Sequence, residues 1–130
     1  MRLIITILLS ATIFIANAQR PQADVEKVKG RNLTIQPITH ATLILSYNKK
    51  NIYIDPTGGA AAFTGLAAPD MIIITDIHGD HFDLKTIEAI NTNNAWLVVP
   101  QAVADKIPAS LSRMVIVLNN GNKKIGRAHV

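Results

Sequence analysis

The alternation of apolar and polar residues in the first half of the chain predicts paired strands. Residues 33–38 alternate in the way that a half-buried strand does. Two apolar segments, 41–47 and 51–55, flank the polar residues 48–50, a connection of hairpin length. The preceding residues 19–31 are polar and predict only a lead-in to this hairpin region.

The second half predicts strands that alternate with helices. Met71–Ile74 is apolar at every position, which is typical of a central strand covered on both faces. In residues 84–91 apolar side chains recur every three positions, and Asp83 stands where a helix N-cap would. The pattern next predicts a buried strand at 96–99, a short helix at 101–107 and a strand at 114–118. A hairpin region followed by this alternation predicts an α/β fold with helices against a mixed sheet.

The amino terminus has the pattern of a secretory signal peptide. A basic start, an apolar run over 3–15 and the small-x-small ending Ala16-Asn17-Ala18 predict cleavage after Ala18. The apolar run is shorter than the roughly 20 residues that cross a bilayer. We therefore expect a secreted or periplasmic protein, with no stable membrane association once residues 1–18 are removed.

The carboxyl terminus has a different peculiarity. Residues 125–130, IGRAHV, resemble the in-frame translation of a common sequencing adapter. We therefore expect 123–130 to be a non-native tail and the natural reading frame to continue. On this interpretation residues 19–122 are the native part of the mature chain.

Charge and cysteine content narrow the classes of function. Of the 13 basic residues, four lie in the two ends, which leaves nine against nine acidic residues in 19–122. A neutral body gives no support for binding of nucleic acid. The chain has no cysteine, so disulfides and thiolate metal sites are excluded. A metal here would have to be held by imidazole and carboxylate.

Such groups are concentrated in TDIHGDH, residues 75–81, directly after the apolar run. The candidate metal ligands are Asp76, His78, Asp80 and His81. We expect Gly79 to adopt a positive φ that turns the neighbouring side chains toward a common centre. Imidazole and carboxylate suit one or two zinc ions, and also iron or manganese, any of which lowers the pKa of a coordinated water. A solvated polar turn is the plainer alternative.

The motif resembles the His-x-His-x-Asp-His signature of the metallo-β-lactamase superfamily. Upstream, ITHATLIL (38–45) and NIYIDP (51–56) resemble segments of one branch of that superfamily. The branch contains the ascorbate-6-phosphate lactonase-like hydrolases and the N-acyl-phosphatidylethanolamine phospholipases. The resemblance implies a four-layer αβ/βα sandwich, of which this chain would form the amino-terminal half.

The resemblance also implies roles for the motif residues. His78 would bind a first metal, whereas Asp80 and His81 would bind a second. Asp80 would in addition act in catalysis by orienting the attacking hydroxide. Asp76 stands where the signature has its first histidine, and this is the departure from the pattern; a carboxylate can still bind zinc.

Two upstream residues fall in the matching segments. His40 is either a pocket residue or a residue that hydrogen-bonds in the core. Asp55 either braces the motif loop as a hydrogen-bond acceptor or serves as an ordinary turn residue before Pro56.

The expected function is that of an exported metal-dependent hydrolase acting on a small-molecule ester, lactone, phosphodiester or amide through metal-bound hydroxide. The ligands that the superfamily draws from its second half are missing between residues 91 and 122, so we expect this chain to be a truncated, inactive fragment. The alternatives are a non-catalytic exported binding or structural protein that retains the fold, and a complete small metal-binding module. Nothing in the sequence favours β-lactam hydrolysis.

Overall fold

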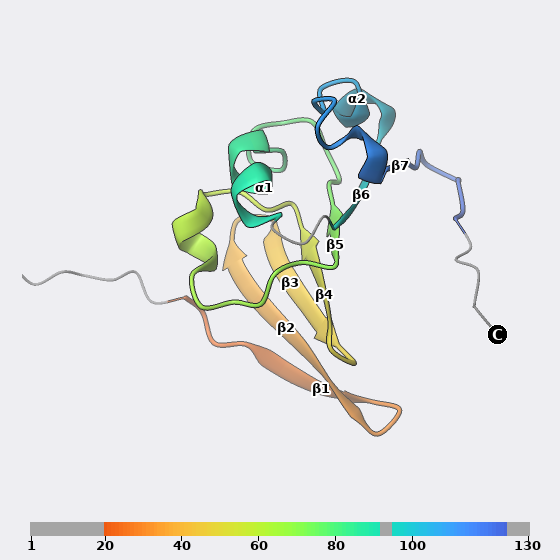
Figure 1. Ribbon diagram of the computed structural model, residues 1–130. Helices are drawn as coiled ribbons and strands as arrows, with labels where there is room; N and C mark the ends of the chain where they lie inside the picture. Colours follow the sequence, from red (N-terminus) through yellow and green to blue (C-terminus); the bar gives the residue numbers. More distant parts are fainter. Residues whose placement is uncertain (1–19, 92–94, 125–130) are drawn as a thin grey trace, which may run out of the picture.

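The computed structural model of the protein describes residues 20–91 and 95–124. Within them, seven strands form one mixed sheet whose spatial order follows the chain (Figure 1). The strands are β1 (Asp24–Val28), β2 (Arg31–Thr39), β3 (Thr42–Tyr47), β4 (Lys50–Ile54), β5 (Met71–Ile73), β6 (Trp96–Val99) and β7 (Val115–Val117). The helices are α1 (Leu84–Ile90), α2 (Gln101–Ala104) and the short 3-10 helices η1 (Ala60–Phe63) and η2 (Ser112–Met114). The expected α/β fold is confirmed.

Two expectations concern residues outside this description. The signal peptide at 1–18 and residues 125–130 of the expected tail lie beyond the described residues. Among the described residues, the structure contains no helix with the length and apolar character needed to span a bilayer.

The first four strands form an antiparallel meander. The predicted hairpin is confirmed, since β3 and β4 are joined by Asn48 and Lys49, whose φ angles of 49° and 62° are left-handed. Such angles at both central positions are those of the turn that matches the natural twist of a two-residue hairpin. The sequence pattern thus located this turn to within one residue.

The lead-in predicted for residues 19–31 is wrong, because Asp24–Val28 forms strand β1. All five of its residues are exposed, and it pairs antiparallel with β2 through the turn at Lys29-Gly30. A strand without a buried face has no apolar alternation to reveal it. The local cue was the turn, where Gly30 adopts a φ of 77°.

From β4 onward, neighbouring strands run parallel and are connected across one face of the sheet. The predicted helix at 84–91 is confirmed as α1, with the carboxylate of Asp83 accepting a hydrogen bond from Thr86 N at 3.2 Å. The helix predicted at 101–107 is confirmed only for its first turn, as α2, and β7 is shorter than the predicted strand at 114–118.

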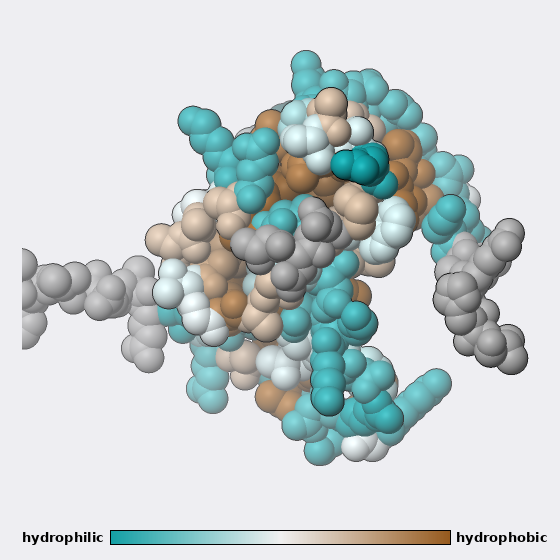
Figure 2. Space-filling view, viewed as in Figure 1, coloured by the Kyte–Doolittle hydropathy of each residue, from teal (hydrophilic) through white to brown (hydrophobic). Residues whose placement is uncertain are grey.

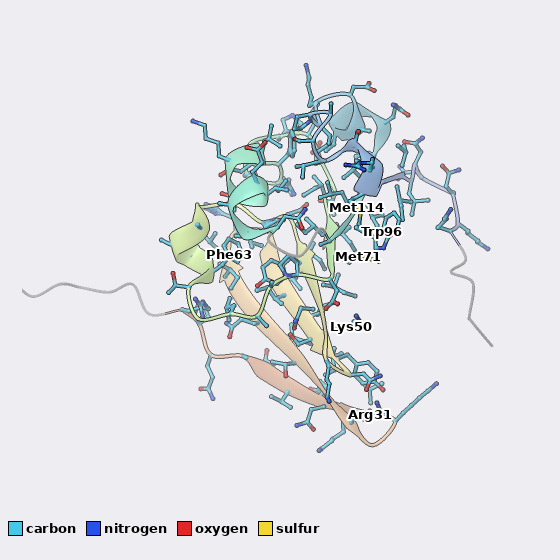
Figure 3. All side chains as sticks on the ribbon, in the orientation of Figure 1. Arg31, Lys50, Phe63, Met71, Trp96 and Met114 are labelled. Atoms are coloured by element: carbon cyan, nitrogen blue, oxygen red, sulfur yellow. The ribbon has the colours of Figure 1, made fainter. Side chains whose placement is uncertain are left out.

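One face of the sheet carries the hydrophobic core. Ile72 and Leu97 point into this core from neighbouring strands and are fully buried. The helices α1 and η1 supply Ile87 and Phe63, and the ring of Phe63 stacks on Tyr53 with centroids 5.4 Å apart. Figure 3 shows Phe63, at the end of η1, away from Met71 and Trp96.

The opposite face is open within the described residues. Met71 and Ile73, which alternate with the buried Ile72, are only half-buried, and Trp96 beside Met71 is 46% exposed. The prediction that Met71–Ile74 is covered on both faces is therefore wrong here. Side chains on this face line two shallow cavities of about 450 and 430 Å³.

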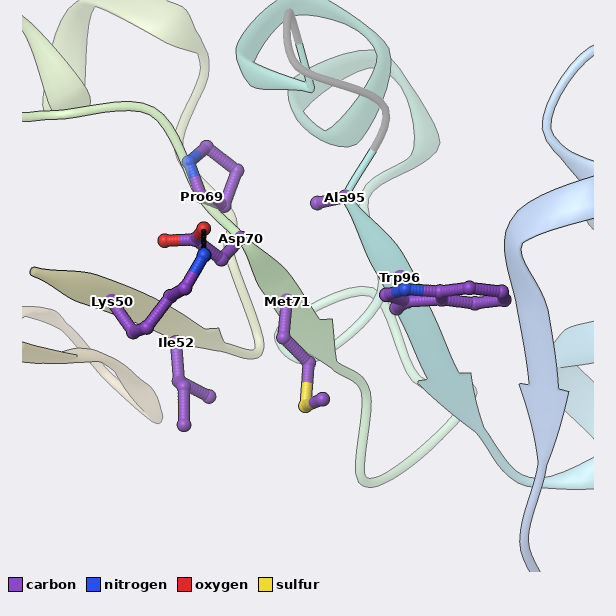
Figure 4. A pocket seen from close by; sticks show the side chains of 7 residues that line it. All are labelled: Lys50, Ile52, Pro69, Asp70, Met71, Ala95 and Trp96. Carbon is purple, nitrogen blue, oxygen red and sulfur yellow. Dashed lines mark hydrogen bonds and ion pairs between the residues drawn. The ribbon is translucent and has the colours of Figure 1, made fainter. Parts of the chain in front are cut away.

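Figure 4 shows the first of these cavities, in which Met71 lies between Trp96 on one side and the ion pair of Lys50 with Asp70, 2.6 Å long, on the other. In the space-filling view, apolar surface also interrupts the polar surface near the helices (Figure 2).

Candidate metal centre

The motif loop lies at the carboxyl edge of the parallel strands. Residues 75–81 follow β5, and Asp55 follows the neighbouring strand β4. Loops that leave this edge of a parallel sheet are the usual place for ligand sites in α/β proteins, because the strands fix their starting points while the loops remain accessible.

The buried Asp55 holds the motif loop by hydrogen bonds to its side chain. Its side chain is buried, and its carboxylate accepts hydrogen bonds from Thr75 N at 2.7 Å, from Thr75 Oγ1 at 2.6 Å and from His81 Nδ1 at 2.9 Å. Its backbone is left-handed, with a φ of 45°, and its carbonyl accepts from the hydroxyl of buried Thr42 at 2.5 Å. The expectation that Asp55 braces the motif loop is confirmed.

His81 is consequently held in one orientation. With Nδ1 donating to Asp55, the other ring nitrogen, Nε2, is presented on the far side, 3.7 Å from Asp80 Oδ2. The hydrogen bond to Asp55 raises the pKa of His81 above its ordinary value, with the charges of Asp55, Asp80 and Asp76 adding to the shift and desolvation opposing it.

His78 makes a similar contact nearer the surface. Its Nδ1 lies 2.8 Å from Asp76 Oδ2, and the other carboxylate oxygen of Asp76 accepts from Ile77 N at 2.6 Å. The hydrogen bond between the two side chains raises the pKa of His78 and lowers that of Asp76.

The expected role of Gly79 is wrong. Gly79 is not among the glycines with positive φ, and a Cβ placed on it would meet no atom within 4 Å. The chain turns instead by a helix-like step, in which the amides of His81 and Phe82 both donate to His78 O at 2.9 and 2.8 Å. A turn of this kind uses ordinary right-handed backbone angles, so it needs no glycine.

The four predicted ligands lie in one loop, but the structure does not bring them to a common point. Among the described residues, no three His, Cys, Asp or Glu side chains are arranged to hold a metal ion. The donor chemistry still suits a divalent cation, because the loop holds two imidazoles and two carboxylates, groups that bind zinc, iron and manganese. The described residues thus offer part of a coordination shell.

An open cavity of about 850 Å³ adjoins the loop. Its wall includes Thr75, Asp76 and Ile77 from the loop, and Pro100 and Asn119 from the segments that follow β6 and β7. A small molecule in this cavity would contact the first residues of the motif, Thr75 and Asp76.

His40 lies at the same sheet edge, in the β2–β3 turn, since β3 begins where its antiparallel partner β4 ends. It is exposed, with a left-handed φ of 44°, so it does not hydrogen-bond in the core as one of its two interpretations held.

Sequence reasoning gave no role to Thr75 or Thr42. Thr75 follows a predicted strand and Thr42 lies near the start of another, and only their contacts with Asp55 show what they do. Thr75 donates twice to the carboxylate of Asp55, and Thr42 donates to its carbonyl.

Comparison with known proteins supports the superfamily that the motif resembles, without distinguishing a branch of it. No curated protein matches the chain. Among solved structures, a candidate metal-dependent hydrolase from Parabacteroides distasonis ATCC 8503 is similar, with a TM-score of 0.66 and 33% sequence identity. The match covers 78% of this chain and 44% of the other, so this chain spans less than half the length of that protein. The model of the β-lactamase superfamily domain matches residues 34–127, which is most of the chain. The chain therefore belongs to the β-lactamase superfamily.

Proposed function

We propose that this chain is the amino-terminal part of an exported metal-dependent hydrolase that acts on a small-molecule ester, lactone, phosphodiester or amide. The observation that carries the proposal is the pair of imidazoles at the carboxyl edge of the sheet, each held at Nδ1 by a carboxylate. The superfamily match and the similar hydrolase from Parabacteroides distasonis support it.

In this proposal His78, Asp80 and His81 contribute donors to a metal, with zinc the first choice and iron or manganese the alternatives. The bound metal supplies Lewis acidity and lowers the pKa of a coordinated water. Asp55 keeps the proton of His81 on Nδ1, so that Nε2 is the free donor. Asp80, whose carboxylate lies near that Nε2, is the residue proposed to orient the nucleophile.

The open face of the sheet supports the view that further structure packs on this chain. The similar hydrolase is more than twice as long as the matched region, and Met71, Ile73 and Trp96 are the surface on which an additional layer would pack. Alone, the chain would expose this apolar face to water, so we expect it to self-associate when expressed by itself.

Metal analysis tests the proposal directly. The protein encoded by the full-length gene, purified without chelator, is offered zinc, iron and manganese in turn, and bound metal is quantified. We expect uptake of one or two zinc ions per chain and loss of uptake in the double variant His78→Ala, His81→Ala. His40→Ala is the matched control and should retain metal. Failure to take up any of the three metals would remove the hydrolase assignment.

Export is a separate part of the proposal. The motivating observation is the amino-terminal pattern of residues 1–18. Mass spectrometry of the protein recovered from a bacterial periplasm is expected to find Gln19 as the first residue. Retention of Met1 on the recovered protein would contradict export by a cleaved signal.

The second candidate, a non-catalytic exported binding protein with this fold, is favoured by one observation: the motif side chains do not converge within the described residues. An activity assay on the protein encoded by the full-length gene distinguishes the two candidates. A hydrolase should cleave p-nitrophenyl acetate or bis(p-nitrophenyl) phosphate in a metal-dependent way, whereas a binding protein should cleave neither even when loaded with metal.

A further inference from the structure

Basic residues are concentrated at the end of the sheet opposite the motif loop. The β1–β2 and β3–β4 turns both lie there, away from α1 and α2 (Figure 1). Arg31 and Lys50 mark this end in Figure 3. We call it the basic end, and its exposed basic residues are Lys27, Lys29, Arg31, Lys49 and Lys50. Although residues 19–122 are neutral as a whole, their charge is thus unevenly distributed in space.

Side-chain contacts join the two turns into one surface. The guanidinium of Arg31 donates a hydrogen bond to the side-chain oxygen of Asn48. The hydroxyl of Tyr47 donates to Val28 O at 3.2 Å. Strand pairing places Arg31 opposite Val28, and Lys50 opposite Tyr47. The positive charges of the two hairpins therefore belong to a single surface.

Little of this charge is neutralised within the protein. Lys50 forms the 2.6 Å ion pair with Asp70, whereas the other four basic side chains are in no salt bridge with a described residue. Glu26 of β1 is the second acidic residue at this end, so five positive charges stand against two negative ones. The carboxyl edge of the parallel strands has the opposite character, since four aspartates lie there: Asp55, Asp76, Asp80 and Asp83.

Two of the lysines stand where the backbone disfavours them. Lys29 and Lys49 have left-handed φ angles of 48° and 62°. Asn and Gly are the residues that usually occupy such turn positions, because a β-carbon meets the backbone there. Turn formation therefore gives no reason for a lysine at either tip, whereas contact with an anionic partner does.

Apolar side chains are exposed beside the lysines of β1. Val25 is 54% exposed and Val28 is 37% exposed, on either side of Lys27 in the chain. A surface that offers both lysine and exposed apolar groups suits the boundary of an anionic bilayer. There the ammonium groups meet lipid phosphates while the apolar groups leave water. A soluble polyanion would use the charges alone.

We propose that the basic end docks the protein reversibly on a membrane that carries anionic lipid headgroups. The proposal goes beyond the hydrolase activity, and its choice of lipid rests on the proposed export, which separates the protein from cellular nucleic acid. Such contact is weak and salt-dependent, and it needs no inserted segment. Docking at this end would direct the motif loop away from the lipid, toward soluble substrates.

Vesicle cosedimentation tests the proposal. The protein encoded by the full-length gene is prepared with Gln19 as its first residue, so that the apolar residues 3–15 cannot contribute. We expect binding to phosphatidylcholine vesicles that also contain phosphatidylglycerol, and none to phosphatidylcholine alone. Binding should be lost at high salt, which screens exposed charges.

Two matched triple variants locate the surface. Lys27→Gln, Lys29→Gln, Lys49→Gln should weaken binding to the anionic vesicles roughly 100-fold, because each lysine near the lipid surface contributes about fivefold. The control removes three exposed basic residues elsewhere and should bind as the natural protein does; it is Lys85→Gln, Lys106→Gln, Arg113→Gln. Equal losses in the two variants would show that net charge alone matters and would overturn the basic end as the docking surface.

A further variant distinguishes lipid from a soluble polyanion. Val25→Ser should weaken binding to the anionic vesicles by a smaller factor and leave binding to heparin unchanged. Binding to heparin without binding to the anionic vesicles would overturn the choice of lipid, and equal binding to both kinds of vesicle would overturn the role of charge.

Metal uptake by each variant shows that it is folded, because the motif loop lies at the other end of the sheet. The same measurement separates this proposal from the proposed function. A natural protein that takes up metal and ignores the anionic vesicles would end the docking proposal and leave the hydrolase assignment. One that binds the vesicles and takes up no metal would do the reverse.

Discussion

The two faces of the central sheet are built from alternate residues of the same strands, and the side chains on them differ in burial. In β5, Ile72 is fully buried against the helices, whereas its neighbours Met71 and Ile73 are half-buried on the open face. In β6, Leu97 is fully buried and Trp96 is 46% exposed. All these residues are apolar, so residue type alone does not say which face is covered; only the position of α1, η1 and α2 does.

Shortening one side chain on each face should have the largest effect on the free energy of unfolding. We expect Leu97→Ala to lower the free energy of unfolding by roughly 2–5 kcal/mol, because it opens a cavity in the core. The matched change Ile73→Ala on the open face removes less buried surface and should cost less than half as much. Urea unfolding of both variants measures the difference. Equal losses would mean that the open face is covered in solution.

A change in α1, which covers the core, tests the contribution of the covered face and leaves the strands unaltered. Asp83→Ala removes the N-cap of α1 and should cost about 1 kcal/mol near neutral pH. The hydrogen bond from the Thr86 hydroxyl holds the pKa of Asp83 below its ordinary value, with the backbone amides of Thr86 and Lys85 adding to the effect and desolvation opposing it.

This cap therefore stabilises the fold above the unfolded-state pKa of about 3.8 and is lost as the pH falls through the lower folded-state value. The stability difference between the natural protein and Asp83→Ala, followed by thermal melting, should shrink on acidification below pH 4 or so. A difference that stays constant down to pH 2 or so would show that the carboxylate charge plays no part.

A smaller effect on stability is expected at the carboxyl edge of the parallel strands, where Asp55 contacts His81. The pKa of His81 is raised by Asp55, so this pair contributes stability below the unfolded-state value of 6.5 and loses it as the pH rises through the folded-state value. We expect the stability advantage of the natural protein over His81→Gln to be greatest in mild acid and to decline above that pH. Melting curves of the metal-free proteins across this range measure it, and a growing advantage at high pH would reverse the assignment.

The smallest effect on stability is expected on the open face. Trp96→Lys should change the free energy of unfolding by no more than about 0.5 kcal/mol, since the side chain is already near solvent. The same change should reduce self-association of the chain, measured by sedimentation or light scattering, because it places a charge in the apolar surface. Leu97→Lys is the contrasting variant and should unfold the protein.

The sequence predicted those elements whose signal is local. The hairpin between residues 41 and 55 has its turn within three polar residues, and α1 has both a repeating apolar stripe and a cap at Asp83. The strand β1 was missed because it buries nothing. The apolar run at Met71–Ile74 predicts cover on both faces, but composition cannot say whether the covering layer lies in the same part of the chain.

The candidate site was predictable as a set of residues and less so as a geometry. The proximity of Asp55 to His81, 26 positions apart in the chain, depends on the parallel pairing of β4 and β5, and it was suggested only by the resemblance. The contact of Asp76 with His78 depends on side-chain rotation within an exposed loop. No spacing rule distinguishes that contact from ligation of a metal.

The order of strands in the sheet has a consequence for how the protein forms. Because each strand lies beside its predecessor in the chain, β1 to β4 can pair with one another before the later strands are in place. Pairings so close in sequence close quickly, whereas each parallel strand must wait for its crossover. The sheet would then grow by adding strands at one edge. At every stage the strand added last is the edge strand with which the next one pairs.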